Sequence, residues 1–306
     1  MTSKPLIHEA PMTLEDFIIT SYCVIDHFFK KNHLNNIRKR GEKPALSDAQ
    51  VITMELVGEY LGQNSDKAIW LYFKTHWLHF FPKIGCRTSF SRQCANTYRL
   101  KHLFQKDLSR QLSAGQDLYL VDGFPIPLCH IKRDKRSKTE LSSIGAVGYC
   151  AAKEEFYFGL KGHILVTPQG STVAYEITAS HVDEREVVPE ISAGLTGMLL
   201  ADKGLIRPEL KAFLSRQGLN LQTPLRANMV DARPKKMVSI MMNIRRKIET
   251  VIGQLVERFK IQSIRVKDLW HLKTKVARKI LAHTFCFMLN KIENHDKPLE
   301  LALLIT

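Results

Sequence analysis

The stretch DLYLVDGF, residues 117–124, constrains the fold of this chain more than any other segment. Its apolar residues form a short run that Gly123 and Pro125 follow. A run of this length with such an ending favours a buried strand over a helix. Asp122 then lies at or near the end of that strand. Because a buried carboxylate needs a counter-charge or a metal ion, another part of the chain has to supply a partner for Asp122.

Two later segments hold candidate partners. The segment GMLLADKGL predicts a second buried strand that again stops on an acid, Asp202. A long basic helix is predicted at about residues 236–259, and it carries Glu249. Carboxylates suit hard cations such as Mg²⁺, and a pair of these ions activates the nucleophile and stabilises the leaving oxygen when a phosphodiester is attacked. The pattern therefore predicts a metal site built from Asp122, Asp202 and Glu249.

Each of these acids also has a purely structural interpretation. A strand-end Asp is often a turn former or a helix cap, and Glu249 stands four residues after Arg245, where it can be a salt-bridge partner. Taken singly, such acids are more often structural; taken together with the strand order and the basic helix, they favour the metal site. Glu257 is a rival to Glu249, but eight helical positions rotate a side chain by about 80°, so both cannot serve equally. Asp183 is a candidate supplementary acid.

The charge of the chain indicates the kind of substrate. Lys and Arg number 45 against 30 acids, so the net charge is +15 and the pI is about 9.6. Residues 235–279 carry 13 bases against 3 acids, and five bases fall within residues 132–138. Such clustering favours nucleic acid as a partner over a merely soluble surface. The candidate phosphate contacts are Lys132, Arg133, Lys135, Arg136, Lys153, Lys161, Arg245, Arg246 and Lys260.

The hydrophobic pattern divides the chain into two parts. Residues 1–112 show helical patterns: Thr13 with Asp16 resembles an N-cap pair, and Ser47 with Gln50 forms a capping-box pattern. From residue 117 on, strands and helices alternate, and a Pro-Gln-Gly turn at residues 168–170 joins two of the strands. We predict helices at 13–30, 47–61, 65–81, 89–112, 184–195, 208–217, 236–259 and 273–291, and further strands at 198–201 and 219–225.

Five segments carry a family resemblance: LSDAQVITMELVGEYLG, DLYLVDGFPIPLCHIKR, YCAAKEEFYFGLKGHILVTPQG, LLADKGL and RRKIETVIGQLVERFKI. Together they resemble the DDE transposases of bacterial insertion sequences, most closely the insertion sequence 982 group. The resemblance implies an α/β RNase H-like catalytic domain at residues 113–306, with a mixed sheet and flanking helices. It also implies an all-α DNA-binding domain at residues 1–112.

The resemblance also assigns roles. It implies Asp122, Asp202 and Glu249 as a catalytic triad that binds Mg²⁺, or Mn²⁺ in its place. In the last segment, Arg245 and Glu249 match an Arg and Glu separated by three residues. Many relatives carry Tyr where this chain has Met242 and Lys where it has Val256; Lys260, one helical turn on, is the candidate substitute for that Lys.

The implied activity is metal-dependent DNA cleavage at element ends, followed by transfer of the freed 3′-hydroxyl into target DNA. The implied partners are double-stranded DNA, as terminal inverted repeats and as target, and a second copy of the chain when assembled on DNA. Three alternatives stay open: an RNase H-like nuclease without strand transfer, a catalytically inactive DNA-binding relic, and a phosphohydrolase of small substrates. The basic segment argues against the last of these.

The remaining composition bears on location. The six cysteines are scattered without a CxxC pair, which favours free thiols in a reducing compartment. Neither a signal peptide nor an apolar run long enough to span a membrane is evident. We therefore expect a cytoplasmic, nucleoid-associated bacterial protein without a membrane partner.

Overall fold

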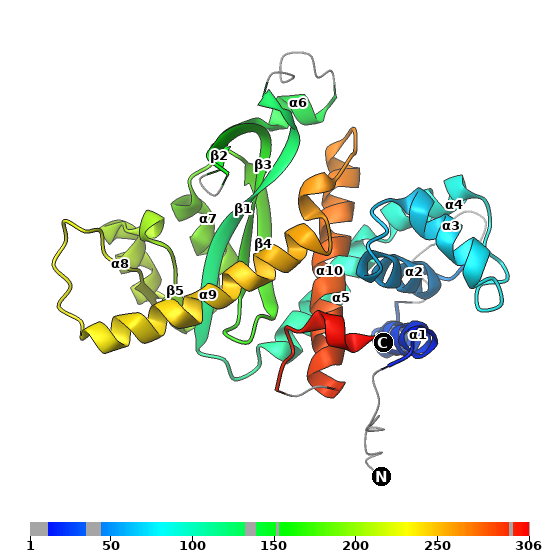
Figure 1. The fold of residues 1–306 in the computed structure, drawn as a ribbon, viewed down its shortest axis with the longest axis horizontal. Helices are drawn as coiled ribbons and strands as arrows, with labels where there is room; N and C mark the ends of the chain where they lie inside the picture. The colour runs from blue at the N-terminus through cyan, green and yellow to red at the C-terminus, as the bar shows by residue number, and fades with distance from the viewer. Residues whose placement is uncertain (1–11, 35–43, 132–138, 151–152, 294–295, 306) are drawn as a thin grey trace, which may run out of the picture. The chain divides into compact units, whose positions relative to one another are not determined.

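The computed structural model describes residues 12–34, 44–131, 139–150, 153–293 and 296–305 (Figure 1). Its contacts divide the chain into two compact units. The first unit comprises Met1–Leu108, Arg258–Lys260 and Trp270–Thr306, and the second comprises Ser109–Glu257 and Ile261–Leu269. The contacts therefore group the carboxyl-terminal helix with the amino-terminal helices, which the hydrophobic pattern alone does not reveal.

The first unit is helical in its described residues. Two of its amino-terminal caps are as predicted: Thr13 accepts the N–H of Asp16, and Ser47 forms a full capping box with Gln50. Its elements are α1 (Leu14–Lys31), α2 (Asp48–Tyr60), α3 (Asp66–His76), α4 (Arg87–Asn96), most of α5 (Tyr98–Leu112), most of α10 (Leu269–Glu293) and the 3₁₀ turn η4 (Leu301–Leu304).

The prediction of one continuous helix over residues 89–112 is wrong. Residues 89–112 form two helices, α4 and α5, which Thr97 separates. Thr97 is fully buried, and its hydroxyl donates to the carbonyl of Cys94 at 2.9 Å. A Thr hydroxyl that bonds its own backbone offers an alternative to the helical pattern, and hydrophobic periodicity does not register that competition.

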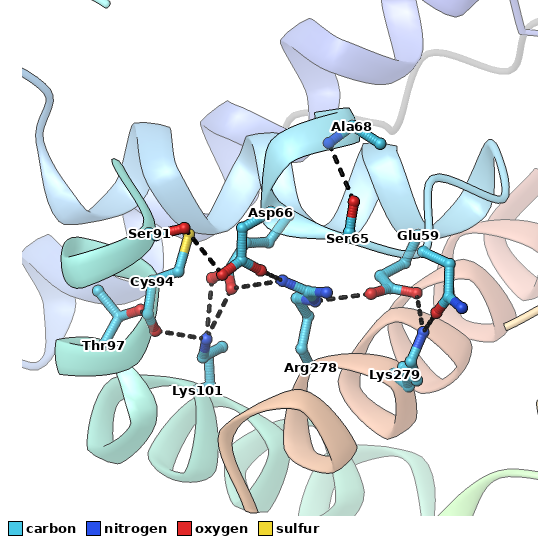
Figure 2. A network of polar contacts seen from close by, with 12 residues as sticks. Glu59, Ser65, Asp66, Ala68, Ser91, Cys94, Thr97, Lys101, Arg278 and Lys279 are labelled. Carbon is cyan, nitrogen blue, oxygen red and sulfur yellow. Dashed lines mark hydrogen bonds and ion pairs between the residues drawn. The ribbon is translucent and has the colours of Figure 1, made fainter. Parts of the chain in front are cut away.

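A buried ion network ties four helices of the first unit together (Figure 2). Lys101 of α5 donates to both carboxylate oxygens of Glu55 in α2, at 2.8 and 2.9 Å. Arg278 of α10 binds Glu59 at 2.6 Å and Asp66 at 2.7 Å. The members of this network are Glu55, Glu59, Asp66, Lys101, Arg278 and Lys279.

The second unit is built on a mixed sheet. Its strands are β1 (Leu118–His130), β2 (Ala146–Cys150), β3 (Glu155–Val166), β4 (Thr172–Ala179), β5 (Gly197–Leu200) and β6 (Leu219–Gln222). The order is β2-β3-β1-β5-β6. β2 and β4 both pair with β3 on the edge away from β1, β2 along the first half of β3 and β4 along the second half. β1 is antiparallel to β3 but parallel to β5, and β5 is parallel to β6. The helices are α6 (Leu141–Ile144), α7 (Glu184–Ile191), α8 (Pro208–Arg216) and α9 (Lys235–Glu257), with 3₁₀ turns η2 (Lys203–Leu205) and η3 (Ile261–Ser263).

The prediction that the first strand ends at Asp122 is wrong, because β1 continues to His130. Proline is tolerated in a strand where its missing N–H faces no neighbour. β5 pairs with β1 only as far as Leu120, so the edge of β1 beyond that residue has no partner from β5. The N–H of Leu128 faces Gly159 of β3, so the nitrogen of Pro127, one position away, faces the open edge. Pro125 shares that edge because it is two positions from Pro127.

The two faces of the sheet are covered by different helices. Tyr119 and Val121 of β1 point into a core that includes Val187 and Val188 of α7 and Leu214 of α8. Side chains alternate along a strand, so the intervening residues of β1, including Asp122, point to the opposite face. Figure 1 shows α9 crossing β1, and α9 supplies the partner of Asp122.

Among the residues that the structure describes, none of the six cysteines forms a disulfide bond. Over the described ranges, no helix is both long enough and apolar enough to cross a membrane.

Candidate active site

The two predicted aspartates lie on adjoining parallel strands. The last residues paired between β1 and β5 are Leu120 and Leu200. Asp122 and Asp202 each follow these leucines by two positions, and the backbone of Asp202 is still extended. Both carboxylates therefore point to the same face of the sheet. They are near enough to repel, because Asp202 contributes to the raised pKa of Asp122.

Arg245 of α9 connects Asp122 with the third predicted acid. Its Nη2 lies 2.8 Å from Oδ2 of Asp122, and its Nη1 lies 3.0 Å from Oε1 of Glu249. Asp122 and Arg245 are largely buried, whereas the side chain of Glu249 is 59% exposed. The pairing of Glu249 with Arg245 anticipated from the sequence is therefore present, and the same guanidinium brings Glu249 next to Asp122.

The environment of Asp122 disfavours its charge. Burial raises the pKa of this carboxyl group from 3.8 to about 6, although Arg245 and the Gly123 N–H oppose the shift. The neighbouring carboxylates Glu184 and Asp202 add to the rise. A cation that entered this cluster would relieve both the burial cost and the repulsion.

Glu184 is an acid of this site that sequence reasoning missed. It is the first residue of α7, and its Oε1 lies 2.6 Å from the point where a Cβ on Gly123 would stand. Gly123 was interpreted from the sequence as a strand stop, but it lies inside β1 and leaves the space that this carboxylate fills. The one signal in the sequence is the Asp-Gly pair at 122–123, which marks a close approach only once the facing helix is known.

The candidate supplementary acid, Asp183, has another partner. It is the N-cap of α7, accepting the N–H of Arg185 at 2.9 Å, and it forms an ion pair with the guanidinium of the same residue. The hydrogen bonds from Arg185 lower the pKa of Asp183 to about 2. Its geometry is that of a helix cap, and the adjacent Glu184, which lies over Gly123, is the acid that adds to the raised pKa of Asp122.

The remaining predicted DNA contacts are scattered. Lys161 of β3 pairs with Glu184 at 3.5 Å, and Lys153 is exposed and donates to Gln262 at 3.3 Å. Arg246 is exposed on α9, and Lys260 is exposed in the first unit. Glu257 lies three helical turns beyond Arg245, roughly 18 Å along the axis. Four candidates lie outside the described residues: Lys132, Arg133, Lys135 and Arg136.

A pocket of about 440 Å³ opens beside Asp202. It is lined by Asp202, Lys203, Gly204, Leu225, Arg226 and Ala227. Two basic side chains therefore share this pocket with a single acid. Ligands of α/β sheets characteristically bind beyond the carboxyl ends of parallel strands, and this pocket lies beyond the ends of β5 and β6.

The donor chemistry of the site suits a divalent cation, but the arrangement is not that of an assembled metal centre. Carboxylate oxygens are the ligands that Mg²⁺ and Mn²⁺ prefer. Among the residues that the structure describes, no three His, Cys, Asp or Glu side chains lie together closely enough to hold a metal. Asp122 and Glu249 instead share the guanidinium of Arg245. The carboxylates of Asp122 and Asp202 are donors of the kind that such an ion prefers, and Glu249 would have to release Arg245 to join them.

Comparison with known protein families identifies the mixed unit. Residues 112–269 match the family described as "Transposase DDE domain", and this span is more than half of the 306 residues. The chain belongs to the transposase DDE domain family. The matched span contains Asp122 of β1, Asp202 just after β5, and the Arg245–Glu249 pair of α9.

A comparison with solved structures concerns the fold of this transposase DDE domain protein. The chain is similar to that in a structure titled "Cryo-EM structure of piggyBac transposase synaptic complex with hairpin DNA", with a TM-score of 0.50 and 10% sequence identity. The match covers 98% of this chain and 81% of the other. At this identity the likeness concerns the fold. A comparison with curated proteins found no match.

Proposed function

We propose that this chain is a DNA transposase of the insertion sequence 982 group, with an RNase H-like core. It cuts DNA at the ends of its element and transfers the freed 3′-hydroxyl into target DNA. The observation that carries the proposal is that Asp122 and Asp202 each stand two positions beyond the last pair of the parallel strands β1 and β5, with Glu249 joined to Asp122 through Arg245. The strand order β4-β3-β1-β5-β6, antiparallel on one side and parallel on the other, supports the core assignment.

Asp122, Asp202 and Glu249 are the residues that would hold Mg²⁺ or Mn²⁺. When bound, a pair of such ions supplies Lewis-acid stabilisation to the attacking and leaving oxygens of the phosphodiester. The basic side chains of the chain hold the DNA: Arg245 exchanges its carboxylate partners for a phosphate, and its bidentate fork suits both. Lys153, Lys161, Arg246 and Lys260 add phosphate contacts that fix the DNA in place without reading its sequence.

The other partners belong to the same proposal. The helices of residues 1–112 bind the terminal inverted repeats, two copies of the chain assemble on DNA, and the protein works in the bacterial cytoplasm at the nucleoid. Its net charge of +15 supports a polyanionic partner. DNA binding through phosphates predicts an affinity that falls steeply with salt.

The decisive experiment compares Asp122→Asn with the wild type. We expect strand cleavage of DNA carrying the element's ends, in Mg²⁺ or Mn²⁺, to fall by at least about 10²-fold, because a carboxylate aimed at the reacting centre is lost. Binding to the same DNA in EDTA should change little. The matched control is Asp117→Asn, an exposed acid just before β1, which should cleave like the wild type. Equal cleavage by Asp122→Asn and wild type would contradict the site assignment.

A second assay separates the transposase from the two alternatives that share its site. A pre-cut end with a free 3′-hydroxyl is offered together with a target plasmid. A transposase joins the two, a nuclease without strand transfer cuts but leaves them separate, and an inactive relic binds DNA without either reaction.

A further inference from the structure

The space over Gly123 is filled by two side chains from different elements. The carboxylate of Glu184 lies 2.6 Å from the position of an added Cβ, and Cδ of Lys161 lies 3.5 Å from it. Gly123 follows Asp122 in β1, and its N–H donates to Oδ1 of Asp122 at 2.9 Å. One glycine therefore has the Asp122 carboxylate on its nitrogen and the pair of Glu184 and Lys161 over its α-carbon.

Glu184 and Lys161 form an ion pair that remains accessible to solvent. Oε1 of Glu184 lies 3.5 Å from Nζ of Lys161, and the two side chains are 30% and 23% exposed. A lysine side chain samples many rotamers, so an oppositely charged neighbour determines where its ammonium lies. Glu184 is such a neighbour, because the first turn of α7 holds it and a helix start favours an acid.

We propose that Glu184 is a positioning residue of this site. It holds the ammonium of Lys161 near Gly123, the residue that follows Asp122 in β1, where Lys161 binds a DNA phosphate that flanks the reacting bond. This inference rests on the proposed function, because it takes DNA as the substrate. It assigns a role to an acid that the predicted triad does not contain, and it explains why the residue after Asp122 is a glycine.

The direction in which Glu184→Ala changes DNA affinity distinguishes a positioning role from simple repulsion of DNA. If Glu184 merely repels DNA, Glu184→Ala removes a negative charge and tightens DNA binding. If it positions Lys161, the same change weakens binding despite the gain in positive charge. We expect about tenfold weaker binding, since a charge-assisted contact is lost, and a salt dependence lowered by about one phosphate contact. Affinity is measured in EDTA over a range of salt concentrations, so that no metal or cleavage enters.

A double-mutant cycle and a second route to the same defect complete the test. Lys161→Ala should weaken binding in the wild type and add nothing in the Glu184→Ala background. Gly123→Ala changes no charge but displaces the carboxylate, so it should reproduce the Glu184→Ala defect. Glu186→Ala, an exposed acid in the same helical turn, is the matched control and should bind as tightly as the wild type or more tightly.

Each outcome decides between the readings. Tighter binding by Glu184→Ala, or an undiminished effect of Lys161→Ala in its background, overturns the positioning role. Glu184→Gln keeps the shape and one acceptor oxygen; it should retain part of the affinity, and full loss or full retention with a folded protein would contradict the mechanism. Failure of the proposed function is distinct: the wild type would then show no salt-sensitive DNA affinity, or Asp122→Asn would still cleave.

Discussion

The two units each contain a cluster of acids and bases, but the clusters differ in balance. In the buried ion network of the first unit, three acids meet three bases, and all except Asp66 are almost fully buried. In the second unit, Asp122, Glu249 and Glu184 pair with two bases, Arg245 and Lys161, and Asp202 adds a further negative charge near Asp122. In the first cluster the ion-paired acids and bases are equal in number, whereas around Asp122 the acids outnumber the bases that pair with them.

The difference appears in two aspartates that are each paired with an arginine. Burial opposes the charge of Asp66, but Arg278 and Lys275 outweigh it and lower the pKa of Asp66 to about 2. Burial also opposes the charge of Asp122, and here Arg245 is outweighed, so the pKa rises to about 6. A balanced cluster of this kind is costly to break, because removing one partner leaves a buried charge uncompensated, while an acid-rich one favours a further cation.

The largest expected effect comes from unbalancing the compensated cluster. Arg278→Ala leaves Glu55, Glu59 and Asp66 with one base fewer in a buried site. We expect the free energy of unfolding to fall by about 3–5 kcal/mol, because an uncompensated buried charge is costly. Urea or thermal unfolding measures the loss. Lys291→Ala, at an exposed position of α10, removes the same charge and should cost little. A loss below about 1 kcal/mol for Arg278→Ala would show that the network is dispensable.

A smaller and more diagnostic effect is the opposite pH dependence of the two aspartates. The pKa of Asp122 is raised on folding, so its contribution to stability falls as pH rises from about 4 to about 6. The pKa of Asp66 is lowered, so its contribution is present above about pH 4 and is lost as pH falls toward 2. Each shift of about 2 pKa units corresponds to about 3 kcal/mol at most.

Two amide substitutions test this opposition. In EDTA, the stability of Asp122→Asn relative to the wild type should improve between pH 4 and pH 7. Loss of the contact with Arg245 lowers the stability of this variant by a constant amount and does not change that trend. The stability of Asp66→Asn relative to the wild type should instead worsen between pH 3 and pH 5. Urea unfolding at each pH gives both curves. Parallel curves for the two variants would mean that the clusters do not differ in the way described.

Local signals explain what could be predicted of the fold. Helix starts at Thr13 and Ser47 follow from side chains three residues apart, and the strand that stops before Asp202 follows from an apolar run. The full length of β1 could not be predicted, because two prolines argue against a strand unless its neighbours are known. Only the early end of β5 shows that Pro125 and Pro127 face an open edge.

The polar clusters also contain residues that local signals reveal and residues that only the tertiary structure reveals. Asp122, Asp202 and Glu249 could be named because each ends or occupies an element that its own neighbours define. Glu184 could not be named, since its role depends on the space left by the missing side chain of Gly123, in a different element of the fold. The partners of Lys101 and Arg278 lie 46 and more than 200 residues away, beyond any periodic pattern. Contacts of that separation are set by tertiary packing alone.

The smallest effect concerns the guanidinium that now stands among the acids. Arg245 binds Asp122 and Glu249 through two nitrogens, while its Nε is buried without a hydrogen-bond partner among the described residues. A guanidinium held in this way competes with a metal ion for the same carboxylates. Arg245→Gln removes one positive charge, so Mn²⁺ should bind about tenfold more tightly in the absence of DNA. Calorimetry or the resonance of free Mn²⁺ measures this affinity. Lys247→Gln, exposed on the same helix, is the control for net charge. Weaker Mn²⁺ binding by Arg245→Gln than by this control would mean that Arg245 organises the acids for the metal, and the contrast between the two clusters would then lie in geometry rather than in charge.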